Sequence, residues 1–286
     1  MQRIISGVMN WGVWGSDLNV KEMSALIEGC LESGVQSFDH ADIYGGHTTE
    51  ATFGKALKEV RHDRTKIEII TKCGIMMPSE ERPQIKAKHY NTSYEHICAS
   101  VDQSLSNLGC EYIDLLLIHR PSPLMDIHDV AKAFDHLQSV GKVGRFGVSN
   151  FTTSQVNLLQ SVYPLHANQV EVSLLETTPF IDGTLDQCIL EEIECMAWSP
   201  LGGGHLFGDE ADPSDLKRLY AVADKYDWTL DQMAYIFLLH HPAGIAPVVG
   251  SSKLHRIKTA VDCLSIEISD EQWFEIYTAA LGHEVA

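Results

Sequence analysis

The feature of this sequence that most constrains its fold is a regular alternation between short apolar runs and longer amphipathic stretches. The short runs are rich in β-branched residues and have the length of buried strands. The longer stretches repeat their apolar residues at helical spacing, as Met23 and Ile27 do within Val20–Ser33. Gly34 follows that stretch and predicts a left-handed helix end. The chain is therefore expected to alternate strands with helices.

Eight segments have the character of strands, and each is followed by at least one predicted helix. The predicted strands are Gly7–Trp11, Val35–Asp39, Ile67–Lys72, Ile113–His119, Arg145–Ser149, Ala167–Val172, Cys195–Ser199 and Ile245–Gly250. The predicted helices are Val20–Ser33, Thr49–Val60, Ser93–Leu108, Val130–Val140, Thr153–Val162, Leu185–Ile193, Ser214–Tyr226 with Ser214 as N-cap, Leu230–His240, Lys253–Cys263 and Asp270–Ala280.

This order favours a parallel sheet closed into a (β/α)8 TIM barrel, with residues 1–286 forming one domain. The Leu-Leu-Leu-Ile run within Ile113–His119 indicates a strand buried on both faces. An open, doubly wound sheet is the alternative fold. Such a sheet would need a glycine fingerprint for its dinucleotide site, and no GxGxxG follows the first or second predicted strand.

The charge of the chain narrows the classes of partner. A formal net charge of -18 repels nucleic acid and anionic lipid, so we expect neither as a partner. No apolar run approaches the roughly 20 residues of a membrane span, and the first residues do not resemble a signal peptide. The seven cysteines show no zinc-like spacing, which favours free thiols, no metal site and a cytoplasmic location.

Polar residues stand at the ends of several predicted strands. Asp39 ends the second strand, Lys72 the third and His119 the fourth, and Tyr44 lies in the loop after Asp39. The carboxyl ends of barrel strands meet at one face, where barrel enzymes carry their active sites. Each residue taken alone is more simply a helix cap, a solvated strand end or a satisfied core side chain. Their joint placement instead predicts an active site.

These four side chains suit a particular chemistry. A free phenol has a pKa of about 10, and the ammonium of Lys72 should lower the pKa of Tyr44. Asp39 can keep Lys72 protonated, while His119 can hydrogen-bond the substrate oxygen. The set predicts a proton donor that faces a carbonyl group, and a hydride source would complete a reduction. A lyase that uses Lys72 as a Schiff base is an alternative, which Asp39 disfavours.

Several segments resemble the signature blocks of the aldo-keto reductase superfamily, and they occur in the family's order over nearly the whole chain. Asp39–Gly45 is similar to the family's Asp-x-Ala-x-x-Tyr-Gly signature. The other similar blocks are Ile70–Lys72, Asp114–Pro121, Gly141–Phe151, Asn168–Glu171 and Ala197–Gly202. The pattern most resembles compact bacterial members, and it implies an oxidoreductase that reduces small carbonyl compounds.

The resemblance also implies a role for each matched residue. Tyr44 would be the proton donor, Lys72 its partner, Asp39 the counterion of Lys72, and His119 the residue that orients the carbonyl. The nicotinamide carboxamide would be bound by Ser149, Asn150 and Gln169, and Trp198 would stack on the nicotinamide ring. The block Ala197–Gly202, which contains Trp198, also supplies the cofactor candidates Ser199, Pro200, Leu201 and Gly202. Trp11, at the end of the first predicted strand, is the candidate substrate-binding residue.

The loop after the eighth predicted strand suits a phosphate group. Gly250 and Ser251 precede a helix, whose N-terminus offers N–H groups and the positive end of its dipole. By resemblance, Ser251, Lys253 and Arg256 would hold the 2′-phosphate of NADPH or NADP+. A second function class stays open, since some barrels of this superfamily serve as cofactor-binding regulatory subunits with little turnover.

Overall fold

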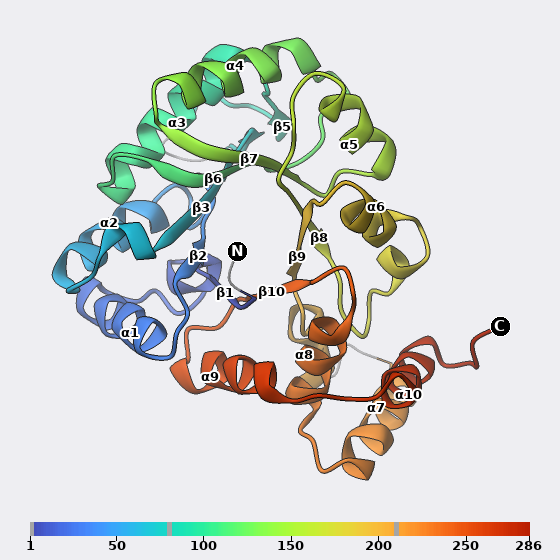
Figure 1. The fold of residues 1–286 in the computed structure, drawn as a ribbon. Coiled ribbons are helices and arrows are strands. Elements are labelled where there is room, and N and C mark those ends of the chain that lie inside the picture. The colour runs from blue at the N-terminus through green and yellow to red at the C-terminus, as the bar shows by residue number, and fades with distance from the viewer. Residues whose placement is uncertain (1–2, 79–81, 209–211) are drawn as a thin grey trace.

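A computed structural model describes residues 3–78, 82–208 and 212–286 of the chain. Eight parallel strands close into a barrel in the order β1-β10-β9-β8-β7-β6-β3-β2, with β1 paired to both β10 and β2. The prediction of a (β/α)8 barrel is thus confirmed, and Figure 1 shows the closed ring of strands. The barrel strands are β1 (Ile5–Gly7), β2 (Ser37–Asp39), β3 (Glu68–Cys73), β6 (Ile113–Ile118), β7 (Val143–Ser149), β8 (Ala167–Glu171), β9 (Glu194–Trp198) and β10 (Ala246–Val249).

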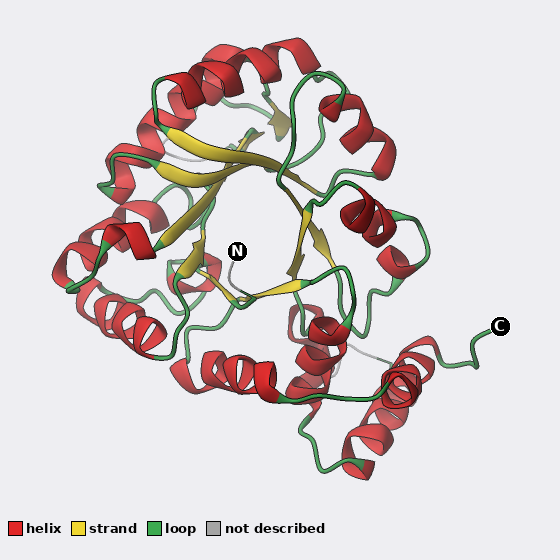
Figure 2. Cartoon of the chain, viewed as in Figure 1, coloured by secondary structure: helices red, strands yellow, loops and turns green. Residues whose placement is uncertain are grey.

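Helices surround the barrel on its outside, as the red ring around the yellow strands in Figure 2 shows. Their ends agree with local sequence signals: Asn19 and Glu22 form a capping box on the first helix, and Gly109 ends the third in the left-handed conformation. The helices are α1 (Val20–Glu32), α2 (Thr49–Glu59), α3 (Tyr94–Leu108), α4 (Ile127–Ser139), α5 (Thr153–Gln160), α6 (Thr184–Leu190), α7 (Pro213–Lys225), α8 (Leu230–His240), α9 (Leu254–Asp262) and α10 (Asp270–Leu281).

Apolar side chains fill both the inside of the barrel and the layer between strands and helices. The period of two along β6 sends Leu115 and Leu117 inward, while Leu116 and Ile118 pack against the helices. All four are at most 1% exposed, which confirms that this strand is buried on both faces. The inner cluster consists of Ile5, Ile70, Leu115, Leu117, Ala167, Met196, Ala246 and Val248.

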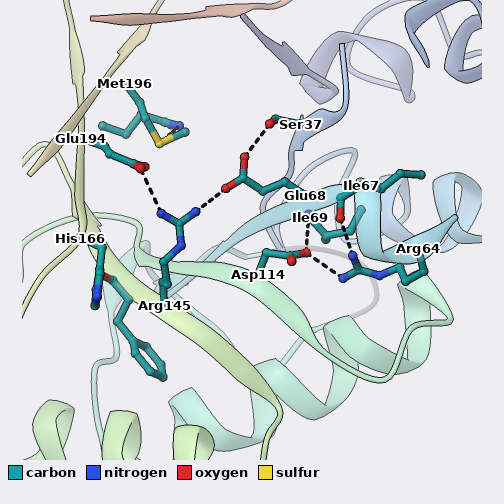
Figure 3. A network of polar contacts seen from close by, with 12 residues as sticks. Ser37, Arg64, Ile67, Glu68, Ile69, Asp114, Arg145, His166, Glu194 and Met196 are labelled. Atoms are coloured by element: carbon teal, nitrogen blue, oxygen red, sulfur yellow. Dashed lines mark hydrogen bonds and ion pairs between the residues drawn. The ribbon is translucent and has the colours of Figure 1, made fainter. Parts of the chain in front are cut away.

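A network of ion pairs closes the end of the barrel at which the strands begin. Arg145 on β7 reaches the carboxylates of both Glu68 on β3 and Glu194 on β9, the latter at 3.0 Å (Figure 3). The hydroxyl of Ser37 on β2 donates to the second oxygen of Glu68 at 2.5 Å. One guanidinium thus links strands from opposite sides of the ring, because its planar fork can donate to two carboxylates at once.

The structure differs from the sequence prediction in three local places. The first strand is Ile5–Gly7 rather than Gly7–Trp11, because Met9–Trp11 forms a turn of 3-10 helix. Asp212 rather than Ser214 caps α7, since its carboxylate accepts a hydrogen bond from the Ser214 N–H at 2.7 Å. A small antiparallel pair was not predicted from the sequence; it consists of β4 (Ile75–Met76) and β5 (His89–Tyr90). Within the described ranges, no helix is long and apolar enough to cross a membrane.

The network at the barrel end yields a prediction about stability. Replacing Arg145 by Met leaves Glu68 and Glu194 without their shared cation, so we expect the free energy of unfolding to fall by about 1–3 kcal/mol. The matched control is Lys142→Met, which breaks the more exposed pair with Asp102 and should cost less than about 1 kcal/mol. Urea denaturation at neutral pH measures both. Equal losses in the two variants would contradict a special role for Arg145.

Candidate active site

Lys72 and Asp39 form a buried ion pair at the carboxyl ends of β3 and β2. The Lys72 Nζ atom lies 2.8 and 2.7 Å from the two carboxylate oxygens of Asp39, and the two residues are only 1% and 2% exposed. The same Nζ donates to the His40 carbonyl oxygen at 2.7 Å and to the Tyr44 hydroxyl at 3.2 Å. Because Lys72 donates to the Tyr44 oxygen, the Tyr44 proton is free to point away from the pair.

The ionisation of the pair and of the phenol follows from burial and from these contacts. Burial opposes the charge on Lys72, but Asp39 and Tyr44 outweigh it and raise the pKa of Lys72 above its ordinary value. Burial also raises the pKa of Tyr44, and the cations of Lys72 and Arg120 lower it only in part. Lys72 therefore acts in the expected direction, but the expected net decrease in the Tyr44 pKa is wrong for this structure. Tyr44 stays protonated at neutral pH.

His119 follows β6 directly and completes the group of four. Its ring centroid lies 6.1 Å from that of Tyr44 in an edge-to-face arrangement. Burial, together with the nearby cations Lys72, Arg120 and Lys88, holds the pKa of His119 well below its ordinary value. The imidazole is thus neutral at neutral pH, and its Nδ1 is buried with no hydrogen-bond partner in the described part of the chain. A neutral imidazole can still donate one hydrogen bond to a ligand.

A chain of hydrogen bonds joins this group to the residues expected to bind a nicotinamide. The amide of Gln169 on β8 donates to Asp39 at 2.9 Å, and the hydroxyl of Ser149 donates to the Gln169 carbonyl at 2.9 Å. Asn150 donates to Ser149 at 2.7 Å and accepts from the indole N–H of Trp198 at 2.9 Å. The structure therefore brings together Ser149, Asn150, Gln169 and Trp198 beside the ion pair.

Two residues near this chain adopt the left-handed backbone region, which is uncommon outside glycine. Asn150 has a φ of 61° and Ser199 a φ of 48°. Such conformations persist when the surrounding structure imposes them, and they cluster at functional sites. Each lies just after a barrel strand, at β7 and β9. Pro200, Leu201 and Gly202 continue from Ser199 into a short 3-10 segment, Gly202–Phe207.

The loop after β10 has the features expected of a phosphate site. Helix α9 begins after Lys253, whose side chain does not cap it, and no hydrogen bond joins the N–H groups of its first turn to a side chain of the described residues. Lys253 and Arg256 are both exposed in this first turn, and Gly250 and Ser251 precede them. Cationic side chains and free helix N–H groups favour an anion here.

Trp11 is not where the sequence prediction put it. Its side chain is 0% exposed and packs in the core against Phe38 and Phe53, at centroid distances of 6.3 and 6.2 Å. Its indole N–H donates to the Ser251 carbonyl at 2.8 Å, so it supports the loop after β10. The assignment of Trp11 as a substrate contact is therefore corrected. Trp14, which is 42% exposed and whose ring lies 6.2 Å from that of Tyr44, lies at the site in its place.

Sequence reasoning also missed Arg120, which stands directly after His119. Its guanidinium carbon lies 5.8 Å from the centre of the Trp198 ring, at the same end of the barrel as Tyr44. Its sequence signals were its position next to a strand-end histidine and its place in the block Asp114–Pro121, and neither gave it a role. Taken together, the site offers a protonated phenol held by a buried ammonium, a neutral imidazole, and an adjacent indole. This arrangement can protonate an oxygen atom and stabilise the charge that develops on it.

Comparison with known proteins agrees with this geometry. The model of the Aldo/keto reductase family matches residues 3–280. The uncharacterized oxidoreductase YcsN of Bacillus subtilis is 46% identical, over 99% of this chain and 95% of that protein. A 6-dehydroglucose reductase of Agrobacterium fabrum is 43% identical, over 100% of this chain and 96% of that protein. Among solved structures, a glycerol dehydrogenase of Gluconobacter oxydans superposes with a TM-score of 0.85 at 23% identity, over 100% of this chain and 94% of that one, and shares the fold.

The buried ion pair yields a prediction that does not depend on activity. Replacing Lys72 by Met removes the counterion of a carboxylate that is 2% exposed, so the free energy of unfolding should fall by about 3–5 kcal/mol at neutral pH. The double variant Lys72→Met/Asp39→Asn no longer buries an uncompensated charge and should recover much of this loss. Urea denaturation of the three proteins measures both effects. If the double variant were less stable than Lys72→Met alone, the pairing argument would be wrong.

Proposed function

The chain belongs to the aldo/keto reductase family, and we propose that it reduces aldehyde or ketone carbonyls to alcohols with NADPH as the hydride donor. The observation that carries the proposal is the contact of Lys72 Nζ with both the Asp39 carboxylate and the Tyr44 hydroxyl. A buried ammonium beside a phenol stabilises the phenolate that forms when the phenol gives up its proton. The proposal treats the four residues as one acid catalyst.

In the proposed reaction, the Tyr44 hydroxyl donates its proton to the carbonyl oxygen of the substrate. The phenolate that remains is stabilised by Lys72, whose Nζ lies 3.2 Å from the phenol oxygen and whose charge Asp39 maintains. His119 donates a hydrogen bond to the same substrate oxygen and orients it. Because these groups are fixed by buried contacts before substrate arrives, little reorganisation accompanies the reaction.

The residues present fit a nicotinamide dinucleotide. When bound, NADPH supplies the hydride that reaches the carbonyl carbon. The amide and hydroxyl groups of Ser149, Asn150 and Gln169 would hold its carboxamide, and the exposed face of Trp198 would pack against its ring. The uncapped start of α9 would hold a phosphate with Lys253 and Arg256. Ser199–Gly202 and Gly250–Ser251 would line the path between the two ends.

Two other functions fit the site less well. A Schiff-base lyase needs an unprotonated and accessible lysine, whereas Lys72 is 1% exposed and donates to three residues. A regulatory barrel that binds cofactor without turnover would have no need for a proton donor. The ordered contacts of Tyr44 with Lys72 therefore favour a catalyst.

Replacing Tyr44 by Phe tests the proton donor. Carbonyl reduction should fall by about 10²- to 10⁴-fold, which is the usual contribution of a general acid. NADPH binding, followed by quenching of tryptophan fluorescence, should stay nearly unchanged because the hydroxyl does not contact the cofactor in this proposal. The matched control is Tyr220→Phe, which alters a tyrosine on α7 that is 45% exposed. Full activity of the Tyr44 variant on a simple aldehyde would refute the assignment.

The second test of this proposal is cofactor choice, for which we expect NADPH to bind more tightly than NADH. The two cofactors differ by one phosphate, which a chain of net charge -18 would repel without local cations. Arg256 can bind that phosphate with a bidentate fork and Lys253 as a point charge. Two charge-assisted hydrogen bonds of about 1.5–3 kcal/mol each should give a preference of at least roughly tenfold.

The dissociation constants of both cofactors should be measured in the parent and in Lys253→Ala/Arg256→Ala. The double variant should lose most of its preference for NADPH while keeping its affinity for NADH. Added salt should weaken the parent's preference, because both side chains are exposed. The control is Lys258→Ala, which removes an exposed cation from a later turn of α9. An unchanged ratio in the double variant would show that these residues do not read the phosphate.

A further inference from the structure

Arg120 is partly buried at the candidate active site, and it forms no ion pair with any described residue. Among residues 3–78, 82–208 and 212–286, no carboxylate lies within ion-pair distance of its guanidinium, and the guanidinium carbon lies 5.8 Å from the centre of the Trp198 ring. Other partly buried arginines behave differently, since Arg64 pairs with Asp114 and Arg145 pairs with Glu68 and Glu194. In a chain with 39 acidic and 21 basic residues, a partly buried guanidinium that forms no ion pair with the described residues keeps its N–H donors available to a ligand.

A carboxylate does lie near this arginine, on the strand next to the one that carries Trp198. Glu171 ends β8 and is paired in register with Trp198, the last residue of β9. Alternation along β8 places Glu171 on the same side as Gln169, which reaches inward to Asp39. Arg120 and Glu171 therefore both adjoin Trp198 at the mouth of the barrel. Together with the exposed ring of Trp14 beside Tyr44, they surround the place where a carbonyl compound would bind.

The set of groups around this mouth indicates what kind of substrate it suits. The guanidinium can only donate hydrogen bonds and the carboxylate can only accept them, so together they match hydroxyl groups, which do both. The exposed indole ring of Trp14 suits the C–H faces of the same molecule. A plain alkyl aldehyde would leave the guanidinium and the carboxylate without partners, at a cost to its binding.

The local charge argues against an anionic substrate. Besides the cation of Arg120, the mouth carries Glu171 and Glu176, and Lys72 is already neutralised by Asp39. Burial and the charge of Glu176 raise the pKa of Glu171, while Arg120 and His205 lower it, so these charges lie within reach of one another. The cations Arg120 and Lys88 are matched by the carboxylates Glu171 and Glu176, so the mouth has no excess of positive charge. A carboxylate or phosphate on the substrate would gain no net attraction there and would be repelled by Glu171 and Glu176.

We propose that Arg120, together with Glu171, is a substrate-binding determinant that selects neutral aldehydes bearing hydroxyl groups next to the carbonyl. This inference rests on the proposed reduction of carbonyls and names the substrate class for it. The guanidinium donates to the hydroxyl oxygens, and a hydroxyl donates to Glu171. Arg120 also lowers the pKa of Tyr44, an effect common to every substrate. The role of Arg120 in binding is therefore measured by the ratio of the kcat/KM values of two substrates, because an effect common to both cancels in that ratio.

The experiment compares glyceraldehyde with propanal, which has the same carbon chain without hydroxyl groups. The parent should have the higher kcat/KM for glyceraldehyde. In Arg120→Met the ratio of the two kcat/KM values should fall roughly ten- to hundredfold, mainly through the KM for glyceraldehyde, because charge-assisted hydrogen bonds are lost. Arg120→Lys keeps the charge without the planar fork and should lose less of the ratio. An unchanged ratio in Arg120→Met overturns the inference, even if both rates fall together.

Glu171→Gln tests the argument from charge. The amide keeps an acceptor and removes a negative charge, so the glyceraldehyde-to-propanal ratio should fall by less than in Arg120→Met. Reduction of succinic semialdehyde, an anionic aldehyde, should rise severalfold. A parent that prefers succinic semialdehyde to glyceraldehyde would overturn the inference and leave carbonyl reduction intact. A parent that reduces none of the three aldehydes would overturn both this inference and the proposed function.

Discussion

The structure of the candidate site depends on one buried ion pair, Lys72 with Asp39. Taking two charges out of water costs several kcal/mol per ion, and attraction between them compensates only when the remaining hydrogen-bonding groups are also satisfied. Here the His40 carbonyl, the Gln169 amide and the Tyr44 hydroxyl supply those contacts. The pair therefore requires β2, β3, β8 and the loop after β2 to meet at one place.

The hydrogen bonds that satisfy this ion pair also connect it to the residues proposed to bind the nicotinamide. Gln169 contacts Asp39 through its side chain and Ser149 through its carbonyl, and Asn150 continues the chain to Trp198. Residues proposed for proton transfer and residues proposed for nicotinamide binding thus share one hydrogen-bonded network across five strands of the barrel. A change at either end alters the geometry at the other, because each group holds the orientation of its neighbour.

Much of this could be predicted from the sequence, and the exceptions have physical reasons. The spacing of apolar residues along strands and helices, and glycines that end helices such as Gly109, are local signals. The barrel and its helices could therefore be predicted. The four polar residues at Asp39, Tyr44, Lys72 and His119 could be grouped because parallel strands align their carboxyl ends. Whether Trp11 or Trp14 faces the core depends on the path of a short loop. Apolar residues in a loop do not repeat at a regular spacing, so the sequence pattern does not show which tryptophan is buried. Whether Arg120 forms an ion pair depends on how far the folded chain places it from each carboxylate, which the sequence pattern does not give.

The two ends of the barrel are held by different means, and this has a consequence for how the protein can change over evolution. At the end where the strands begin, Arg145, Glu68 and Glu194 join the strands to one another. These three residues all lie on strands, away from the loops at the opposite end. Substitutions or insertions there can reshape the mouth of the site while the barrel stays shut. Descendants of such a chain are free to acquire new specificities without first having to regain a stable fold.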